Sequence, residues 1–225
     1  MQWLDAALEG QATAALWTGQ PGLVAPLSYR RYAQLDAACA ASAAQGWPVR
    51  LRRSGGGVVP QGPGILNVTL AYPCAGAVGN MAERVYAHLC QVLLNAMDSL
   101  GIAAFVSSVK GSFCDGRFNL AVNHHGRTRK IAGTAQYWRR ANGRQAVLAH
   151  ALLIVTADPL HLSTQANQFE TALNSDHQYD ANALTSVVQC WPATHPGSAL
   201  SSDPSVSIFN TVTQHIAASL IHQPA

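Results

Sequence analysis

The chain has 225 residues, of which 48% are hydrophobic and only 11% are charged, and its formal net charge at pH 7 is +3. No apolar run reaches the ~18 residues that a membrane span requires, and five cysteines without a CxxC pair argue against a zinc site or a disulfide framework. The small net charge argues against nucleic-acid binding, so we expect one cytosolic domain that covers residues 1–225.

The first part of the chain predicts two helices, two loops and a strand. Apolar spacing predicts a helix over residues 4–16 and a second helix over 30–44, separated by a loop over 19–28 that is rich in Gly and Pro. A short strand over 49–53 leads into a glycine-rich loop over 54–64. Glycines there would let the backbone approach a ligand closely.

A second strand and the clearest helix follow. Residues 65–72 alternate between apolar and polar side chains, which predicts a strand with Asn67 on its polar face. Apolar residues at helical spacing predict a helix over 81–100, with Asn80 at its start and Gly101 at its end.

The remaining sequence predicts a sheet and a closing helix. Further strands are expected over residues 103–109, 120–123, 130–136 and 147–156, with a turn at His124-His125-Gly126. Residues 174–204 are polar and predict a loop, after which Asp203-Pro204 begins a helix that reaches about residue 221. Runs of strands around one long helix indicate an α+β fold with a mixed β-sheet flanked by helices.

The segment Arg-Arg-Ser-Gly-Gly-Gly at residues 52–57 is a candidate binding loop. Consecutive glycines let backbone N–H groups converge on an anion or a carbonyl oxygen, and the arginines add fixed positive charge. An ordinary flexible loop is the alternative. The segment lacks the spacing of a P-loop.

Cys114 and Lys130 are the candidate reactive residues. Cys114 is expected in a partly exposed turn among Gly, Asp and Arg, where nearby cations favour a thiolate. Lys110 and Lys130 are the two lysines beside twelve arginines, so each is a candidate for a role that needs a compact amine, Lys130 the better one. The alternatives are a packed free thiol and a solvated charge on an edge strand.

Other conspicuous side chains are assigned to structure. Trp17 and Trp191 are expected to pack rather than to contact substrate. The same holds for four of the thiols: Cys39, Cys74, Cys90 and Cys190.

Together these motifs resemble the biotin/lipoate protein ligase family. They read RRSGGG (52–57), GILN (64–67), NLAV (119–122), KIAGTAQ (130–136) and HALL (150–153), in the family's order within a core of about 16–159. The resemblance implies a catalytic domain like that of class II aminoacyl-tRNA synthetases, followed by a helical tail over about 160–225. It also implies transfer of a lipoyl, octanoyl or biotinyl group to a lysine of a carrier domain.

Within the family, the segment FCDGRFNL at 113–120 resembles the cysteine loop of octanoyl- or lipoyl-transferring amidotransferases. In that branch the cysteine forms a thioester with the acyl chain, and no cofactor is expected. ATP-dependent ligases usually have a histidine and an aspartate where this chain has Gln61 and Asn119. The alternatives are a lipoate-protein ligase that uses ATP and Mg, and a non-catalytic domain that binds acyl groups or carriers.

The resemblance implies Cys114 as the nucleophile and Lys130 as the positive charge near the oxyanion or the thiolate. His150 could instead be a core histidine. Twelve residues are implied to bind substrate: Arg53, Ser54, Gly55, Gly56, Gly57, Asn67, Asn119, Gly133, Thr134, Ala135, Gln136 and His150.

The expected donor and acceptor are lipoyl carrier domains, of the glycine cleavage H protein or of a 2-oxoacid dehydrogenase acyltransferase subunit. No metal, nucleic acid or membrane partner is expected. Such carriers tend to be acidic, so arginines around one hairpin could form a docking face, although a solvated edge is the alternative. These are Arg127, Arg129, Arg139, Arg140 and Arg144.

Overall fold

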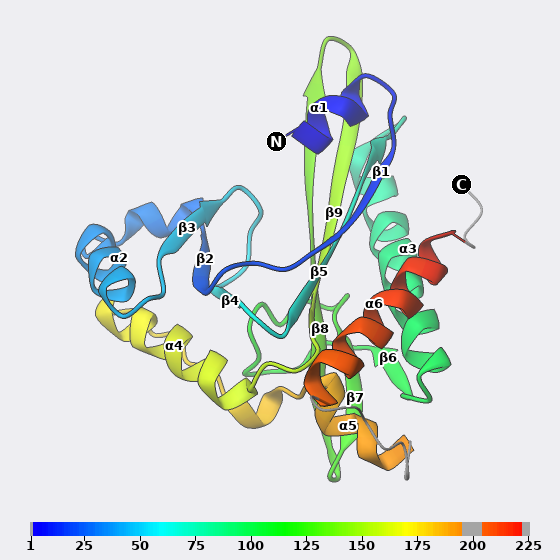
Figure 1. The fold of residues 1–225 in the computed structure, drawn as a ribbon. Coiled ribbons are helices and arrows are strands. Elements are labelled where there is room, and N and C mark those ends of the chain that lie inside the picture. Colours follow the sequence, from blue (N-terminus) through cyan, green and yellow to red (C-terminus); the bar gives the residue numbers. More distant parts are fainter. Residues whose placement is uncertain (1, 195–203, 222–225) are drawn as a thin grey trace.

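The computed structural model describes residues 2–194 and 204–221, which form two β-sheets with helices around them (Figure 1). The larger sheet is antiparallel throughout, in the spatial order β1 (Thr13–Trp17), β5 (Ile65–Pro73), β9 (Arg144–Ile154), β8 (Arg127–Ala141), β7 (Leu120–His124) and β6 (Ala104–Val106). In the smaller sheet, β2 (Gly22–Pro26) is parallel to β3 (Val49–Arg52) and antiparallel to β4 (Val59–Gln61). The α+β prediction is confirmed, with the parallel pair confined to the smaller sheet.

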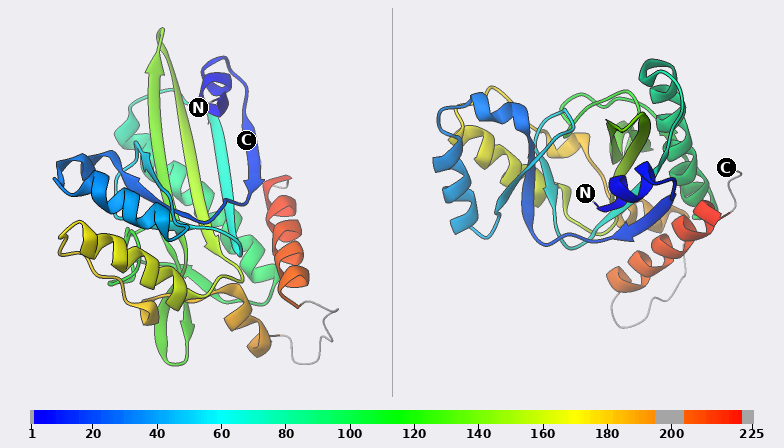
Figure 2. Two further views of the ribbon diagram at one scale, coloured as in Figure 1. Left: turned by 60° about the vertical axis from the view of Figure 1, so that its left-hand side comes forward. Right: turned by 90° about the horizontal axis from the view of Figure 1, so that it is seen from above.

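Helices lie on both sides of the larger sheet (Figure 2). One side carries α3 (Val78–Ser99) and α6 (Pro204–Ile221), and the other carries the smaller sheet with α2 (Leu35–Ala44) and α4 (Pro159–Ala172). The short helices are α1 (Gln2–Leu8), α5 (Val187–Thr194), η1 (Leu27–Arg31) and η2 (Ala181–Ala183). None of the helices in the described residues is long and apolar enough to cross a membrane.

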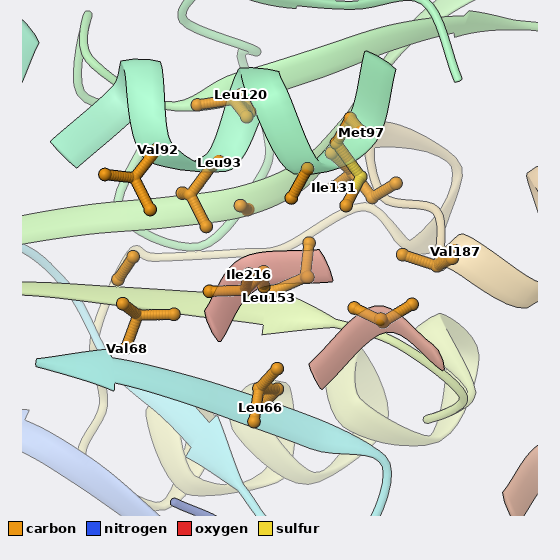
Figure 3. Close-up of a cluster of buried hydrophobic side chains, with 14 of the residues drawn as sticks. Leu66, Val68, Val92, Leu93, Met97, Leu120, Ile131, Leu153, Val187 and Ile216 are labelled. Atoms are coloured by element: carbon orange, nitrogen blue, oxygen red, sulfur yellow. The ribbon is translucent and has the colours of Figure 1, made fainter. Parts of the chain in front are cut away.

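The main hydrophobic core lies between α3, α6 and the larger sheet (Figure 3). Leu93 and Met97 are four residues apart on α3, so they lie on one helix face, and both are fully buried. They share this core with Leu66 and Val68 of β5, whose other face carries Asn67, as the alternation predicts.

The N-terminal predictions are partly wrong. The helix ends at Leu8, and residues 13–17 form β1, which pairs with β5. The loop predicted over 19–28 contains β2, and the second helix begins at Leu35 after η1. Strands β1 and β2 pair with segments far away in the sequence, which local patterns do not reveal.

Three later boundaries also differ. Strand β4 lies inside the predicted loop over 54–64, and α3 begins at Val78, so Asn80 lies within the helix. The loop predicted over 174–204 contains η2 and α5.

Other predictions hold. Gly101 follows the end of α3 with a φ of 68°, and α6 begins at Pro204. Asp203 and the side chain of Leu220 lie outside the described residues. The turn between β7 and β8 is confirmed, with φ of 50° at His125 and 70° at Gly126.

Candidate functional site

A cavity of about 620 Å³ lies between the two sheets, and its wall is mainly apolar. Strand β9 serves the cavity and the core at once, because its side chains alternate between the two faces of the sheet. Those that line the cavity are Leu148, His150, Leu152 and Ile154, and those in the core are Val147, Ala149, Ala151 and Leu153. The cavity therefore suits an uncharged chain.

A register shift on β8 determines which way Lys130 points. The pairing between β7 and β8 is irregular at Leu120 and Ala121, so that Ile131 and Ala132 both belong to the core under α3. Lys130 therefore lines the cavity, as Gly133 does. Without this bulge, two residues of opposite parity would lie on opposite faces.

The ammonium of Lys130 is buried and holds the loop that carries Cys114. Lys130 is only 4% exposed, and its Nζ donates to the carbonyl oxygen of Cys114 at 2.9 Å and to that of Phe113. Burial lowers the pKa of Lys130 to about 8, although Cys114 and Asp115 offset part of the shift. Lys130 is thus a cation at neutral pH that can release a proton.

Cys114 is partly exposed and lines the cavity with a left-handed backbone, φ 49°. Its carbonyl oxygen accepts a hydrogen bond from Asn119 Nδ2 at 2.7 Å besides the one from Lys130. These two donors hold a conformation that is unusual for a residue other than glycine.

Arg52 fixes the glycine loop beside the thiol. Its guanidinium donates to the carbonyl oxygens of Val24 at 2.6 Å, Gly55 at 2.8 Å and Gly57 at 2.7 Å. A Cβ on Gly56 would overlap Cys114 Sγ and lie 3.1 Å from Arg52 Nη2. The loop therefore covers the thiol closely, with a fixed positive charge next to it.

Two asparagines in the predicted substrate-binding set are supports behind the cavity wall. Asn119 is 1% exposed and accepts a hydrogen bond from Thr134 N–H at 3.1 Å. Asn67 is fully buried and exchanges two hydrogen bonds with Gln61, both 2.9 Å long. Each amide uses a donor and an acceptor.

His150 is a neutral histidine in the cavity wall. Thr69 Oγ1 accepts from Trp17 Nε1 at 3.0 Å and lies 3.0 Å from His150 Nδ1. Burial and the charge of Arg52 lower the pKa of His150 to about 4. A neutral ring that accepts from Thr69 carries its proton on Nε2, so His150 adds a donor to this wall.

Nine of the fourteen candidate residues line the cavity: Arg53, Ser54, Cys114, Lys130, Gly133, Thr134, Ala135, Gln136 and His150. Five do not: Gly55, Gly56, Gly57, Asn67 and Asn119. A Cβ on Gly133 would lie 3.0 Å from Lys130 Nζ, so the space that this glycine leaves open is taken by the lysine.

Sequence reasoning missed several residues of this site. Arg52, rather than Arg53 alone, lies against the thiol, and Trp17 lines the cavity instead of only packing. Leu184, from the segment predicted as a polar loop, also lines it. Lys110 is exposed and outside the cavity lining.

The five arginines do not surround one hairpin, so that prediction is wrong. Strand β8 is 15 residues long, about 50 Å, and its two hairpins lie at opposite ends of the molecule (Figure 1). Arg127 and Arg129 lie near one end. Near the other end, Arg139 pairs with Asp5, and Arg144 pairs with Glu9 at 2.7 Å.

The other four cysteines differ from Cys114 in their surroundings. Burial raises the pKa of each of their thiols, and none of the four lines the cavity: Cys39, Cys74, Cys90 and Cys190. The site therefore combines one thiol, an ammonium and a guanidinium beside an apolar cavity. This arrangement suits nucleophilic attack on a carbonyl that carries an apolar chain.

Comparison with known proteins agrees with this chemistry. Residues 4–191 match the family described as lipoyl protein ligase A/B catalytic domain. An uncharacterized protein of Cupriavidus necator is 50% identical over 192 residues, which cover 82% of this chain and 76% of the relative. An octanoyl-GcvH:protein N-octanoyltransferase of Kyrpidia tusciae is 38% identical over 148 residues, which cover 63% of this chain and 49% of the relative. The alignment thus spans about half the length of that transferase.

Solved structures share the fold. Lipoate-protein ligase A bound with ATP superposes with a TM-score of 0.65 at 16% identity, covering 97% of this chain and 78% of that one. The lipoate protein ligase of Thermoplasma acidophilum, from a study of a bipartite ligase and its E2 lipoyl domain, gives 0.60 at 15% identity, covering 97% and 77%.

The contact between Gly56 and Cys114 can be tested by a double-mutant cycle. We expect Gly56→Ala to lower the free energy of unfolding by about 3 kcal/mol, since the methyl group meets Sγ and φ is 97°. In a Cys114→Ala background the loss should shrink to about 1 kcal/mol, because only the backbone strain remains. Chemical denaturation measures both values.

Gly76→Ala is the matched control. Its φ is 101°, and a Cβ there meets nothing within 4 Å. It should therefore cost about 1 kcal/mol in both backgrounds. Equal losses for Gly56→Ala with and without the thiol would show that the glycine does not abut Sγ.

Proposed function

Because this chain belongs to the lipoyl protein ligase A/B catalytic domain family, we propose that it transfers an octanoyl or lipoyl group to the lysine of a lipoyl carrier domain through a thioester at Cys114. The observation that carries this proposal is the pairing of Cys114 with the buried Lys130 in the wall of an apolar cavity. Such a cavity fits an eight-carbon chain better than a charged group.

In the first step, the thiolate of Cys114 attacks the carbonyl carbon of the acyl group, which an amide links to the donor's lysine. Lys130 and Arg52 supply positive charge close to the thiolate. The carbon–nitrogen bond breaks, and Lys130 gives its proton to the departing amine. The products are an acyl thioester on Cys114 and the free donor lysine.

In the second step, the acceptor's lysine amine attacks the thioester. The carbon–sulfur bond breaks, a new amide forms, and Cys114 leaves as the thiolate. Neutral Lys130 takes up the proton that the attacking amine loses, which restores the starting state.

Asn119 favours direct transfer over adenylation. Its amide donates to the Cys114 carbonyl oxygen and accepts from Thr134 N–H. An ionised aspartate, which the sequence comparison leads one to expect in ATP-dependent ligases, could accept but not donate. The asparagine therefore suits a chain in which the cysteine loop itself must be held in place.

The relatives' names suggest the partner. The Kyrpidia transferase is named for octanoyl-GcvH, and the Thermoplasma ligase was studied with an E2 lipoyl domain. A carrier of the glycine cleavage H type is thus the first donor to test, with the acyltransferase subunit of a 2-oxoacid dehydrogenase as acceptor. The five free cysteines fit the cytoplasmic location proposed with this function.

Thioester formation can be tested by intact mass. We expect octanoylated H-type carrier to add one octanoyl group to the protein without ATP, because the thiol attacks the amide directly. The adduct should be removed by hydroxylamine and be absent in Cys114→Ala. The matched control Cys39→Ala, which changes a thiol outside the cavity, should keep it. No adduct, together with ATP-dependent attachment of free lipoate to the carrier, would instead establish a ligase.

The pKa of Lys130 predicts the pH dependence of the first step. The ammonium is needed to protonate the leaving amine and is lost above its pKa of about 8. The single-turnover rate of thioester formation should therefore fall as pH rises through about 8. Lys130→Met should remove this decline and lower the rate by about 10² to 10⁴. A wild-type rate that keeps rising beyond this pH would contradict the role of Lys130.

A further inference from the structure

The segment 179–185, which follows α4, contacts separate parts of the site. Asp180 N–H donates to the carbonyl oxygen of Gly111 at 2.9 Å, at the start of the cysteine loop. Thr185 N–H donates to the carbonyl oxygen of Lys130 at 2.9 Å. Sequence analysis had assigned this segment to a polar loop, yet it connects the two chain segments that carry the proposed catalytic residues.

Tyr179 extends these contacts to the glycine loop. Its hydroxyl accepts from Val58 N–H at 3.1 Å and donates to Glu170 Oε1 at 2.9 Å. A Cβ on Gly57 would lie 2.6 Å from the same hydroxyl oxygen. Its ring lies against Phe113, with the ring centroids 5.0 Å apart. One side chain thus touches the glycine loop and the residue before Cys114.

Tyr179 is itself held firmly by α4. Asn167 accepts from Tyr179 N–H at 2.8 Å and donates to the Tyr179 carbonyl oxygen at 2.9 Å. Glu170 is fully buried, and its Oε1 also accepts from Tyr29 OH at 2.7 Å. No described residue pairs with Glu170 Oε2, so two tyrosine hydroxyls hold this carboxyl group.

We propose that Tyr179 is a positioning residue, which holds the glycine loop against Cys114 with its hydroxyl and steadies Phe113 with its ring. Through Val58 it fixes the segment that places Gly56 against Sγ. Through Phe113 it steadies a carbonyl oxygen that Lys130 binds. Its effect on acyl transfer rests on the proposed function, whereas its effect on the exposure of the thiol does not.

Loss of the hydroxyl should free the glycine loop. Val58 is fully buried, so its N–H would lose its acceptor inside the protein. A buried donor without an acceptor is costly, and the loop can relieve this cost by moving towards water. Because the loop covers Cys114 Sγ, such movement exposes the thiol while it disturbs the geometry for attack.

Tyr179→Phe and Tyr29→Phe form a matched pair. Each removes one of the two hydroxyls bonded to Glu170 Oε1, but only Tyr179 reaches Val58 and the glycine loop. The measurements are the melting temperature, the rate at which iodoacetamide alkylates Cys114 as read by peptide mass spectrometry, and single-turnover transfer from octanoylated carrier.

Both variants should melt at a lower temperature. Tyr179→Phe should alkylate at Cys114 roughly three to ten times faster than wild type, and its transfer kcat should fall about tenfold or more with the carrier KM unchanged. Tyr29→Phe should match wild type in alkylation and transfer. Identical alkylation and kcat for the two variants would overturn the proposal.

A second variant covers the case in which Tyr179→Phe does not fold. Asn167→Ala removes the side chain that holds the Tyr179 backbone and should raise Cys114 alkylation in the same direction. Unchanged alkylation in it would count against the proposal. If wild type shows no transfer at all, the proposed function fails, and the alkylation rates alone decide whether Tyr179 positions the loop.

Discussion

The hydrogen bonds from the buried ammonium of Lys130 to the cysteine loop organise the rest of the site. A cation that is only 4% exposed must find acceptors inside the protein, and it finds them in the carbonyl oxygens of Phe113 and Cys114. Gly133 leaves space for the lysine, and Asn119 supplies a further donor to Cys114. The same burial lowers the pKa of the lysine, so one constraint provides both position and reactivity.

The larger sheet lets a stable core and a binding cavity share the same strands. Its helix-facing side is filled by apolar side chains from α3 and α6, while its other side is left as the cavity wall. A bulge on β8 changes the alternation at Ile131 and Ala132, which places Lys130 on the cavity side without taking an apolar residue from the core. The smaller sheet and α4 then close the cavity and carry the residues that hold the glycine loop.

Local sequence patterns predicted the elements whose signals are local. The helix that ends before Gly101 and the alternation of β5 around Asn67 follow from spacing and turn residues alone. The strand over 13–17 read as helix, because its hydrogen-bond partner lies more than fifty residues away in β5. The arginine cluster failed for a related reason, since β8 extends well beyond the predicted 130–136.

The sequence by itself determined the α+β class, the glycine segment, Cys114 and Lys130, because these depend on residue identity, order and spacing. Only the tertiary structure decided how they meet. It placed Arg52 and Gly56 against the thiol and moved Asn67 and Asn119 behind the wall. It also brought Tyr179 between the two loops. These contacts join residues far apart in the chain, so they depend on how strands pair and which faces are buried, which no local pattern specifies.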